Sequence, residues 1–561
     1  MKGNFRRIVF LSVFAFVVAD FVLWSQAPQK HTRWCALSDF TYDPEKESIV
    51  SIVPSDHPSL SRPCPITEKL DYEQVEEMVS LAVDLAGGLE NLLEPTDRKI
   101  VIKPNLVEPA PNGNGANTDW RVVRALVLLL YRLNPEFEIV VAEGAGDWAR
   151  PGTPLVSDSA LEGDGYEVSG YREMIEFLQN DPDFPGLNLR WVDLNYDQVT
   201  EIPVPGPRLS DCQTSFFLPR TVLGADFVIN VPVLKVHSTC ITAGLKNWIG
   251  LLPGMVYGWP KALGYNNNGI RLDHDTEFIH KNIADLVRTV GCDLVVVDCI
   301  VGKEKTKFRW GNPRRRNMIV AGDDVVSVDA VCASLIGLNP EDVEHITLAA
   351  LSGVGQNDLE RIEVRGGLID ECKTRFVKAE NELPLDHKNK LYPYYGQGNR
   401  VWLLNGPHPG LDMKTDYLGG EAGAAPLPEL DGWSQPIFFF DNTIDPAGYF
   451  QDSVDCTYYA FTYLQAHQDT RARLWLGSSG NIKVWLNGEV VYTYDNGTRA
   501  HKLPNDLVEV NISAGLNRIL VKAPMQYGIC EFSLNVCEPE NDKNYAGNRL
   551  EGVRFVTDFR L

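Results

Sequence analysis

Charged and polar side chains follow five apolar segments of the chain, each at the point where the segment ends. The ends are Lys103-Pro-Asn105, Glu143-Gly-Ala-Gly146, Leu234-Lys235-Val-His237, Asp298 and Gly322-Asp323-Asp324. In an open α/β sheet the carboxyl ends of parallel strands meet at one edge, and ligands bind there. If the segments are such strands, the sequence predicts a polar site at that edge.

The residue types at this edge could bind an anion and transfer protons. Lys235 and His237 alternate along an extended segment, so their side chains point to the same face. That arrangement suits two donors directed at one anion, or an acid/base pair. Lys246, on a short predicted helix, would add a cation for a phosphate or carboxylate group, and Glu143 could transfer protons. We predict Lys235, His237, Lys246 and Glu143 as catalytic residues.

Further polar residues near these segments could hold the ligand or a metal ion. The predicted ligand-binding residues are Lys103, Asn105, Thr118 and Asn247. The carboxylates of Asp298, Asp324 and Glu143 could bind a divalent cation, because such cations prefer oxygen ligands. Apart from this possible divalent metal, the sequence points to no cofactor.

Each of these residues also has a structural interpretation. Lys103 could be a strand-end residue in solvent, and Asp298 and Asp323 could cap the segments that follow them. Glu143-Gly-Ala-Gly146 could be only a turn, since a short glycine-rich match is weak evidence for phosphate binding. The functional interpretation rests on the group, because random surface charge has no reason to collect at a ligand-binding edge.

The elements that would position these residues alternate between strand and helix. Apolar strands are predicted at 99–103, 138–143, 189–194, 226–232, 293–298 and 317–321, and helices at 120–133, 171–179, 242–249, 277–290, 325–336 and 341–351, after a first helix that begins at Tyr72. Thr118 is a plausible N-cap of the helix at 120–133. Such alternation is typical of crossover connections. Residues 71–370 are therefore predicted to form an α/β domain with a mostly parallel sheet and helices on both faces.

The C-terminal part has a different pattern. Short strands are predicted at 458–464, 472–476, 482–486, 489–494, 507–512, 517–522 and 531–536. Asn487-Gly488 supplies the positive φ angles of a type I′ hairpin. This spacing predicts an antiparallel β-sandwich over 431–540, with 371–430 as a linker or extension and 541–561 as a tail. Trp475 and Trp485 could stack on a sugar, or they could belong to the core.

The N-terminus has the plan of an export signal. Lys2, Arg6 and Arg7 precede an apolar run from Ile8 to Trp24, as in a secretory signal. Residues 1–27 are predicted to be a cleaved signal peptide or an uncleaved membrane anchor, and 28–70 a stalk. We therefore expect the protein to be secreted, periplasmic or anchored on the extracytoplasmic side, with this segment as its only membrane contact.

Composition narrows the classes of partner and cofactor. The formal net charge is −23, which disfavours a nucleic-acid partner because polyanions are repelled. The 11 cysteines include no Cys-x-x-Cys. Without that spacing, zinc-ribbon and ferredoxin motifs are absent and no iron–sulfur cluster is expected.

The ordered motifs resemble a known family. They are Lys103-Pro-Asn105, Thr118 with its helix, Glu143, Asn230-Val-Pro-Val-Leu-Lys235-Val-His237, Leu245-Lys246-Asn247-Trp-Ile-Gly250, Asp298 and Asp324-Val-Val-Ser-Val-Asp329. Over about residues 95–367 the chain resembles the family catalogued as "domain of unknown function 362". The resemblance identifies a domain and no reaction. Some members carry a ferredoxin segment, from which this chain departs. The sandwich resembles galactose-binding-like sandwiches, through Arg473-Leu-Trp-Leu-Gly-Ser-Ser, Val484-Trp-Leu-Asn-Gly and Ala514-Gly-Leu-Asn517-Arg-Ile-Leu-Val-Lys522.

Two functions fit these observations. The first is an exported enzyme that acts on a small phosphate- or carboxylate-bearing substrate by acid/base or metal-assisted chemistry. The second is a non-catalytic envelope protein that binds an anionic ligand, or a glycan through its sandwich. Hydride transfer is unsupported, because the chain has no convincing dinucleotide fingerprint.

Overall fold

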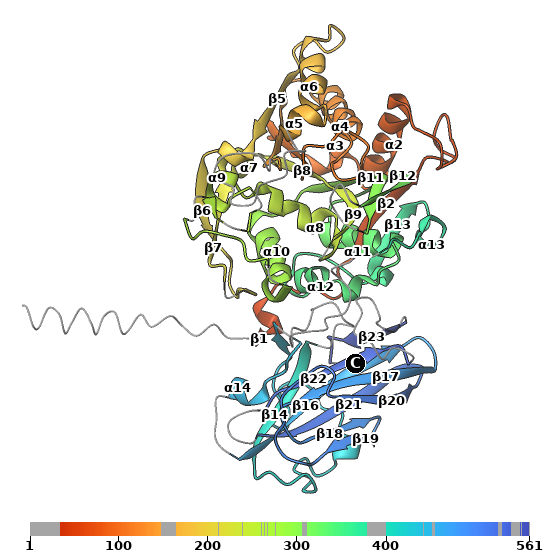
Figure 1. Ribbon diagram of the computed structural model, residues 1–561. Helices are drawn as coiled ribbons and strands as arrows, with labels where there is room; N and C mark the ends of the chain where they lie inside the picture. Colours follow the sequence, from red (N-terminus) through yellow and green to blue (C-terminus); the bar gives the residue numbers. More distant parts are fainter. Residues whose placement is uncertain are drawn as a thin grey trace, which may run out of the picture.

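The computed structural model describes residues 34–146 and 164–559, apart from 211, 238, 260, 263, 266–267, 275, 306–310, 378–399, 441, 451–454, 526–529, 540–549 and 551. An α/β part and a β-sandwich lie one above the other (Figure 1). The predicted signal or anchor at residues 1–27 lies outside the described residues. Within the described residues, no helix is both long and apolar enough to cross a membrane.

The α/β part is built on a mixed sheet of ten strands in the described chain. The strand order is β13 (Ile362–Gly366), β2 (Ser48–Pro54), β12 (Asn312–Gly322), β11 (Leu294–Glu304), β8 (Phe227–Val231), β3 (Lys99–Pro104), β4 (Glu138–Glu143) and β5 (Asn188–Asp193), with β9 (Val233–His237) beside β11 and β10 (Cys240–Thr242) beside β9. The run from β11 to β5 is parallel.

β12 departs from the predicted mostly parallel sheet. It pairs antiparallel with both β11 and β2, although β13 and β2 are again parallel. The sequence showed β12 only as another apolar run, and strand direction is not encoded in such a run. The prediction is thus confirmed for the half of the sheet that carries β11, β8, β3, β4 and β5, and it is wrong for β12.

Helices cover both faces of this sheet, as predicted. The helices are α2 (Tyr72–Leu85), α3 (Leu89–Leu92), α4 (Trp120–Leu133), α5 (Gly165–Val168), α6 (Tyr171–Asn180), α7 (Arg220–Leu223), α8 (Gly244–Asn247), α9 (Gly254–Tyr257), α10 (Thr276–Val290), α11 (Val325–Leu335), α12 (Glu344–Leu351) and α13 (Ile369–Cys372). Alternate strand residues enter different cores: Ile100 and Ile102 pack with α2, α4 and α6, whereas Val101 packs with α10, α11 and α12. Strand alternation therefore explains the two layers of helices.

The C-terminal part is an antiparallel β-sandwich, as predicted. One sheet has the order β1 (Trp34–Ala36), β15 (Ile437–Phe439), β14 (Val401–Pro409), β16 (Cys456–Ala466), β21 (Gly515–Pro524), β18 (Ile482–Leu486) and β19 (Glu489–Tyr494), with β23 (Val553–Val556) beside β16; the other is β20 (Asp506–Ile512), β17 (Thr470–Ser478) and β22 (Phe532–Cys537). A short helix, α14 (Pro446–Phe450), and a two-strand ribbon in the α/β part, β6 (Val199–Pro203) with β7 (Ser215–Pro219), complete the set. The β18–β19 turn has φ of 52° at Asn487 and 89° at Gly488, as a type I′ turn requires.

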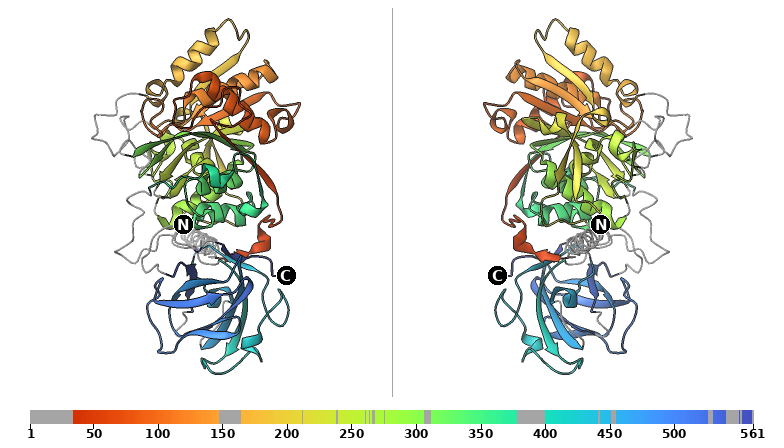
Figure 2. Two further views of the ribbon diagram at one scale, coloured as in Figure 1. Left: turned by 90° about the vertical axis from the view of Figure 1, so that its right-hand side faces the viewer. Right: turned by 90° about the vertical axis from the view of Figure 1, so that its left-hand side faces the viewer.

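Segments outside the two predicted domains contribute strands to the sheets of both parts. The predicted stalk contributes β1 to the sandwich and β2 to the α/β sheet. Residues 34–54, red in Figure 2, run along one side of the molecule from one part to the other. The predicted linker contributes β14, which lies between β15 and β16, and the predicted tail contributes β23. These strands were missed because they are short or isolated among residues rich in proline and charge.

Candidate functional site

A buried ion pair joins the ends of two neighbouring parallel strands. Lys103 at the end of β3 pairs with the carboxylate of Glu143 at the end of β4, and their side chains are 0% and 2% exposed. Burial lowers the pKa of the Lys103 amine, and the negative charge of Glu143 opposes that shift. Gly250 lies against the pair, because a Cβ atom there would be 2.4 Å from Glu143 Oε1. The prediction that the two strand ends meet is confirmed.

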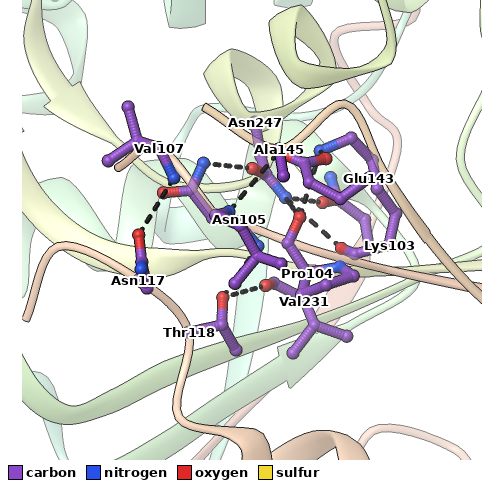
Figure 3. Close-up of polar contacts among 12 residues, drawn as sticks. Lys103, Pro104, Asn105, Val107, Asn117, Thr118, Glu143, Ala145, Val231 and Asn247 are labelled. Carbon is purple, nitrogen blue, oxygen red and sulfur yellow. Dashed lines mark hydrogen bonds and ion pairs between the residues drawn. The ribbon is translucent and has the colours of Figure 1, made fainter. Parts of the chain in front are cut away.

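Asparagine side chains continue the network from this pair (Figure 3). Asn105 Nδ2 donates to Asn247 Oδ1 at 2.8 Å, and Asn247 Nδ2 donates to Asn230 Oδ1 at 2.7 Å. Lys235 Nζ donates to Asn105 Oδ1 at 2.5 Å and to the carbonyl oxygen of Ala116 at 2.5 Å. The structure therefore brings Lys103, Asn105, Lys235 and Asn247 together around the carboxyl ends of β3, β8 and β9.

Asp329 holds the short helix that carries Asn247. Its two carboxylate oxygens accept from the amides of Gly244 at 2.6 Å and Leu245 at 3.1 Å, which are the first residues of α8. Burial raises the pKa of Asp329 to about 8. The sequence motif contained this residue but gave it no role. Its contacts show that it positions α8 and, through α8, Asn247.

Thr118 connects strand ends and does not cap α4. Its hydroxyl donates to the carbonyl of Val231 at 2.7 Å and accepts from the amide of Asn105 at 2.9 Å. The N-cap of α4 is Asp119, which accepts from the Arg121 amide. The predicted role of Thr118 as N-cap is therefore wrong by one residue, although Thr118 does lie beside Asn105.

Asp298 lies at the predicted edge, on the face of the sheet that α4 covers. Its carboxylate accepts from the amides of Asp119 at 2.7 Å and Ile300 at 2.9 Å. Burial, assisted by the charge of Asp119, raises the pKa of Asp298 to about 7. Asp298 is thus integrated into the start of α4, and a proton is held there more readily than on an exposed aspartate.

Asp324 lies at the opposite edge of the sheet. The antiparallel register aligns Gly322 with Val295 and Met318 with Cys299, so the carboxyl end of β12 lies at the amino end of β11. Asp324 caps α11 by accepting from Val326 and Ser327, and it pairs with Lys46 at 2.9 Å. The prediction that Asp324, Asp298 and Glu143 share a metal site is not supported by this geometry. Among the described residues, no group of three or more histidine, cysteine, aspartate or glutamate side chains could hold a metal ion.

His237 and Lys246 are both buried but have different surroundings. His237 Nδ1 accepts from the Thr239 amide at 3.1 Å, at the turn between β9 and β10. The charge of Lys246 contributes to lowering the pKa of His345, after burial, to about 3. His345 in turn stacks on His280, with Nδ1 atoms 3.0 Å apart. Lys246 thus faces the histidine pair on α10 and α12.

The glycines after β4 pack closely against neighbouring backbone. The Gly144 amide donates to the carbonyl of Gly250 at 3.0 Å, and the Gly146 amide donates to that of Leu106 at 2.6 Å. A Cβ atom at Gly146 would lie 1.9 Å from the Val107 carbonyl oxygen. The amides of Gly144 and Gly146 are thus bonded within the protein and are not available to a phosphate group.

Two buried lysines at this edge were not predicted. Lys303, on the extended β11, aligns with Lys235 in the parallel register, and its Nζ lies 4.0 Å from Glu108 Oε1. Lys261, 6% exposed, donates from Nζ to Asn195 Oδ1 at 2.6 Å. The predicted strand ended at Asp298, whereas β11 ends six residues later at Glu304. A prediction that extended the strand to its true end would have included Lys303. No sequence pattern pointed to Lys261.

Comparison with known proteins supports the family assignment. Residues 100–334 match the profile described as Domain of unknown function (DUF362). No curated protein matches the chain. Similar solved structures include the lactate racemase apoprotein from Thermoanaerobacterium thermosaccharolyticum, at 11% identity over 52% of this chain and 59% of that chain with a TM-score of 0.27.

Other similar structures cover the sandwich. They include the PA14 domain of MpAFP antifreeze protein, at 15% identity over 17% of this chain and 50% of that chain, and the PA14 sugar-binding domain from an RTX adhesin, at 14% over 18% and 57%; both have a TM-score of 0.15. The chain spans between half and three-fifths of the length of the three structures, and such low TM-scores do not establish a shared fold. The resemblance to this family seen in the sequence is thus confirmed by the match over residues 100–334.

Proposed function

We propose that this protein is an enzyme that binds a small phosphate- or carboxylate-bearing substrate at the edge formed by β3, β4 and β9. The observation that carries the proposal is the burial of cationic and imidazole side chains there: Lys103 is 0%, Lys235 1% and His237 4% exposed. Removing an ammonium group from water is costly. Buried groups with shifted proton affinity therefore collect at functional sites more often than elsewhere.

The contacts support a division of roles. Lys235 and Asn105 are joined by a hydrogen bond. Asn105 donates in turn to Asn247, whose Nδ2 donates to the backbone carbonyl of Lys103 at 3.5 Å. An anionic group would gain charge-assisted hydrogen bonds from the two lysines. Glu143 and His237 then supply the groups that exchange protons with the substrate. Participation of a divalent metal stays a separate prediction.

The test is thermal denaturation of the full-length protein with inorganic phosphate, small carboxylates and divalent cations. A ligand at about 100 times its dissociation constant stabilises the folded state by about 2.7 kcal/mol. We expect phosphate or a carboxylate to raise the melting temperature of the wild type and of Lys69→Met, an exposed lysine in the same part of the chain. The shift should be absent in Lys235→Met. An equal shift in both variants would place the ligand elsewhere.

A receptor is the alternative, and His237→Gln separates it from an enzyme. In an enzyme this substitution abolishes turnover of a ligand identified by the thermal test, while the ligand still stabilises the protein. In a receptor it changes only the affinity.

Export and glycan binding are further proposals. Export is supported by the charged and apolar pattern of residues 1–27. Glycan binding is supported by the sandwich architecture, but not by the two tryptophans first considered. Trp475 is 1% exposed and Trp485 is 3% exposed, so neither ring has a face available for a sugar.

A further inference from the structure

Lys261 is a buried amine that the proposed function has not used. Its Nζ donates to Asn195 Oδ1 at 2.6 Å, and that same oxygen accepts from the Gly254 amide at 2.9 Å. In the described part of the chain Lys261 forms no ion pair, unlike Lys103, which pairs with Glu143. The ammonium group is thus held by a neutral amide oxygen.

The backbone places this amine beside the Lys103–Glu143 pair. A Cβ atom at Gly144, the residue after Glu143, would lie 3.1 Å from Lys261 Nζ and 2.5 Å from the Gly250 carbonyl oxygen. A Cβ atom at Gly250 would lie 2.8 Å from Lys103 Nζ. Two glycines therefore allow two lysines to approach one carboxylate from the ends of different segments.

The conformation of Lys261 is held by its surroundings. Its φ angle is 64°, in the left-handed region that a lysine rarely adopts. Its amide donates to the carbonyl of Gly258, and its carbonyl accepts from the amide of Leu272, both at 2.9 Å. Such conformations persist where the surrounding contacts determine them, and they are frequent at ligand sites.

We propose that Lys261 is a ligand-binding residue that, with Lys103, holds the anionic group of the substrate beside Glu143. This inference rests on the proposed function, and it adds a further binding residue and the uptake of a proton when the anion binds at the same site. The Lys261 ammonium group is acted on by the carboxylates of Glu143 and Asp193 and by the Lys103 ammonium group. A bound phosphate or carboxylate oxygen would be attracted to the two ammonium groups.

The proton affinity of Lys261 gives this binding a measurable signature. Burial lowers the pKa of the Lys261 amine to about 8; the carboxylates of Glu143 and Asp193 oppose this shift, and the charge of Lys103 adds to it. A nearby anion favours the charged form and raises the pKa. At about pH 8, roughly half of the Lys261 amines are neutral and take up a proton when an anion binds.

The experiment is calorimetric titration of the full-length protein with sulfate and with oxalate, two dianions that do not titrate near pH 8. Repeating each titration in two buffers of different ionisation enthalpy gives the number of protons taken up. We expect about half a proton per anion in the wild type. Lys261→Arg should bind with less proton uptake than the wild type, because arginine stays charged. Lys261→Met should bind at least about tenfold more weakly, and Lys69→Met should match the wild type.

The outcomes separate this inference from the proposed function. Equal proton uptake by the wild type and Lys261→Arg, or equal affinity in Lys261→Met, overturns the role of Lys261 and leaves the anion site standing. Absence of binding by both dianions also overturns it. The proposed function falls only if phosphate and carboxylates also fail to stabilise the wild type in thermal denaturation.

Discussion

Arg400 Nη2 lies 2.5 Å from Glu344 Oε1, and these side chains are 3% and 4% exposed. Arg400 immediately precedes β14 of the sandwich, whereas Glu344 begins α12 of the α/β part. The next residue, His345, stacks on His280, and the charge of Lys246 acts on both histidines. One buried ion pair therefore connects the sandwich to the helices behind α8.

Arg400→Met is expected to destabilise the whole protein. The substitution leaves the Glu344 carboxylate buried without its cation and removes the hydrogen bond from Arg400 to the Phe440 carbonyl. Breaking a buried pair by removing one partner costs about 3–5 kcal/mol. Urea denaturation measures the change in the free energy of unfolding. Arg471→Met is the matched control, because its pair with Glu509 is 66% and 58% exposed and exposed pairs contribute about 0–1 kcal/mol.

The comparison of the two variants decides whether the junction is structural. If Arg400→Met unfolds at the same urea concentration as Arg471→Met, the buried pair does not hold the two parts together.

The candidate site was predicted best where its residues follow parallel strands. Lys103, Asn105, Lys235 and Asn247 come together because β3, β8 and β9 run in the expected direction. Asp324 was misplaced because its strand runs the other way, and an apolar run does not record direction. Lys261 was missed because it lies in a loop whose conformation depends on distant contacts.

Asp324→Ala should lower stability without affecting anion binding. Its carboxylate caps α11 and accepts from the Gln356 amide at 3.1 Å, and loss of such a cap costs about 1 kcal/mol. Asp324 lies at the far edge of the sheet from Lys103 and Lys235. Calorimetric titration with oxalate should therefore give the wild-type affinity. A tenfold loss of oxalate affinity would show that Asp324 belongs to the ligand site after all.

Asp298 should make stability fall as the pH rises. Its folded-state pKa, about 7, is above the value of about 3.9 for an unfolded aspartate. The folded chain therefore binds the proton more tightly. The stabilisation is complete below about pH 4 and is lost as the pH rises through about 7, by up to about 1.4 kcal/mol per pH unit. Urea denaturation at several pH values between about 5 and 7 gives the change in the free energy of unfolding with pH. This change should be smaller for Asp298→Asn than for the wild type. Equal changes in the two proteins would contradict the role given to Asp298.

The fold was predicted in its layers but not in its boundaries. Amphipathic helices and alternating strands reveal themselves locally, so both architectures were recognisable. The partners of β1, β2, β14 and β23 lie far away along the chain, and pairing over such separations leaves no local pattern. The sandwich therefore includes residues before and after the predicted 431–540.

A fragment of residues 431–540 should fail to fold. It lacks β14, which pairs with β16 over Leu403–Pro409 and with β15, and it also lacks β1 and β23. The fragment also lacks Trp402 and Leu404, both 0% exposed in the full-length protein, and their absence would leave a gap in its core. Circular dichroism during heating should show no cooperative transition, in contrast to the full-length protein. A sharp transition would show that β14 is dispensable, and glycan binding could then be measured on the fragment.

Asn247→Ala should weaken the site more than the fold. It removes the amide that bridges Asn105 and Asn230, so buried polar groups lose partners at a cost of about 1–3 kcal/mol. Because Asn105 also receives the hydrogen bond of Lys235, its displacement should lower oxalate affinity about tenfold or more. Asn91→Ala, which removes an exposed hydrogen bond to Gly87, is the control. Calorimetric titration and urea denaturation of both variants separate the two effects. Reduced stability with unchanged affinity would make the asparagine network a structural support and not part of the ligand site.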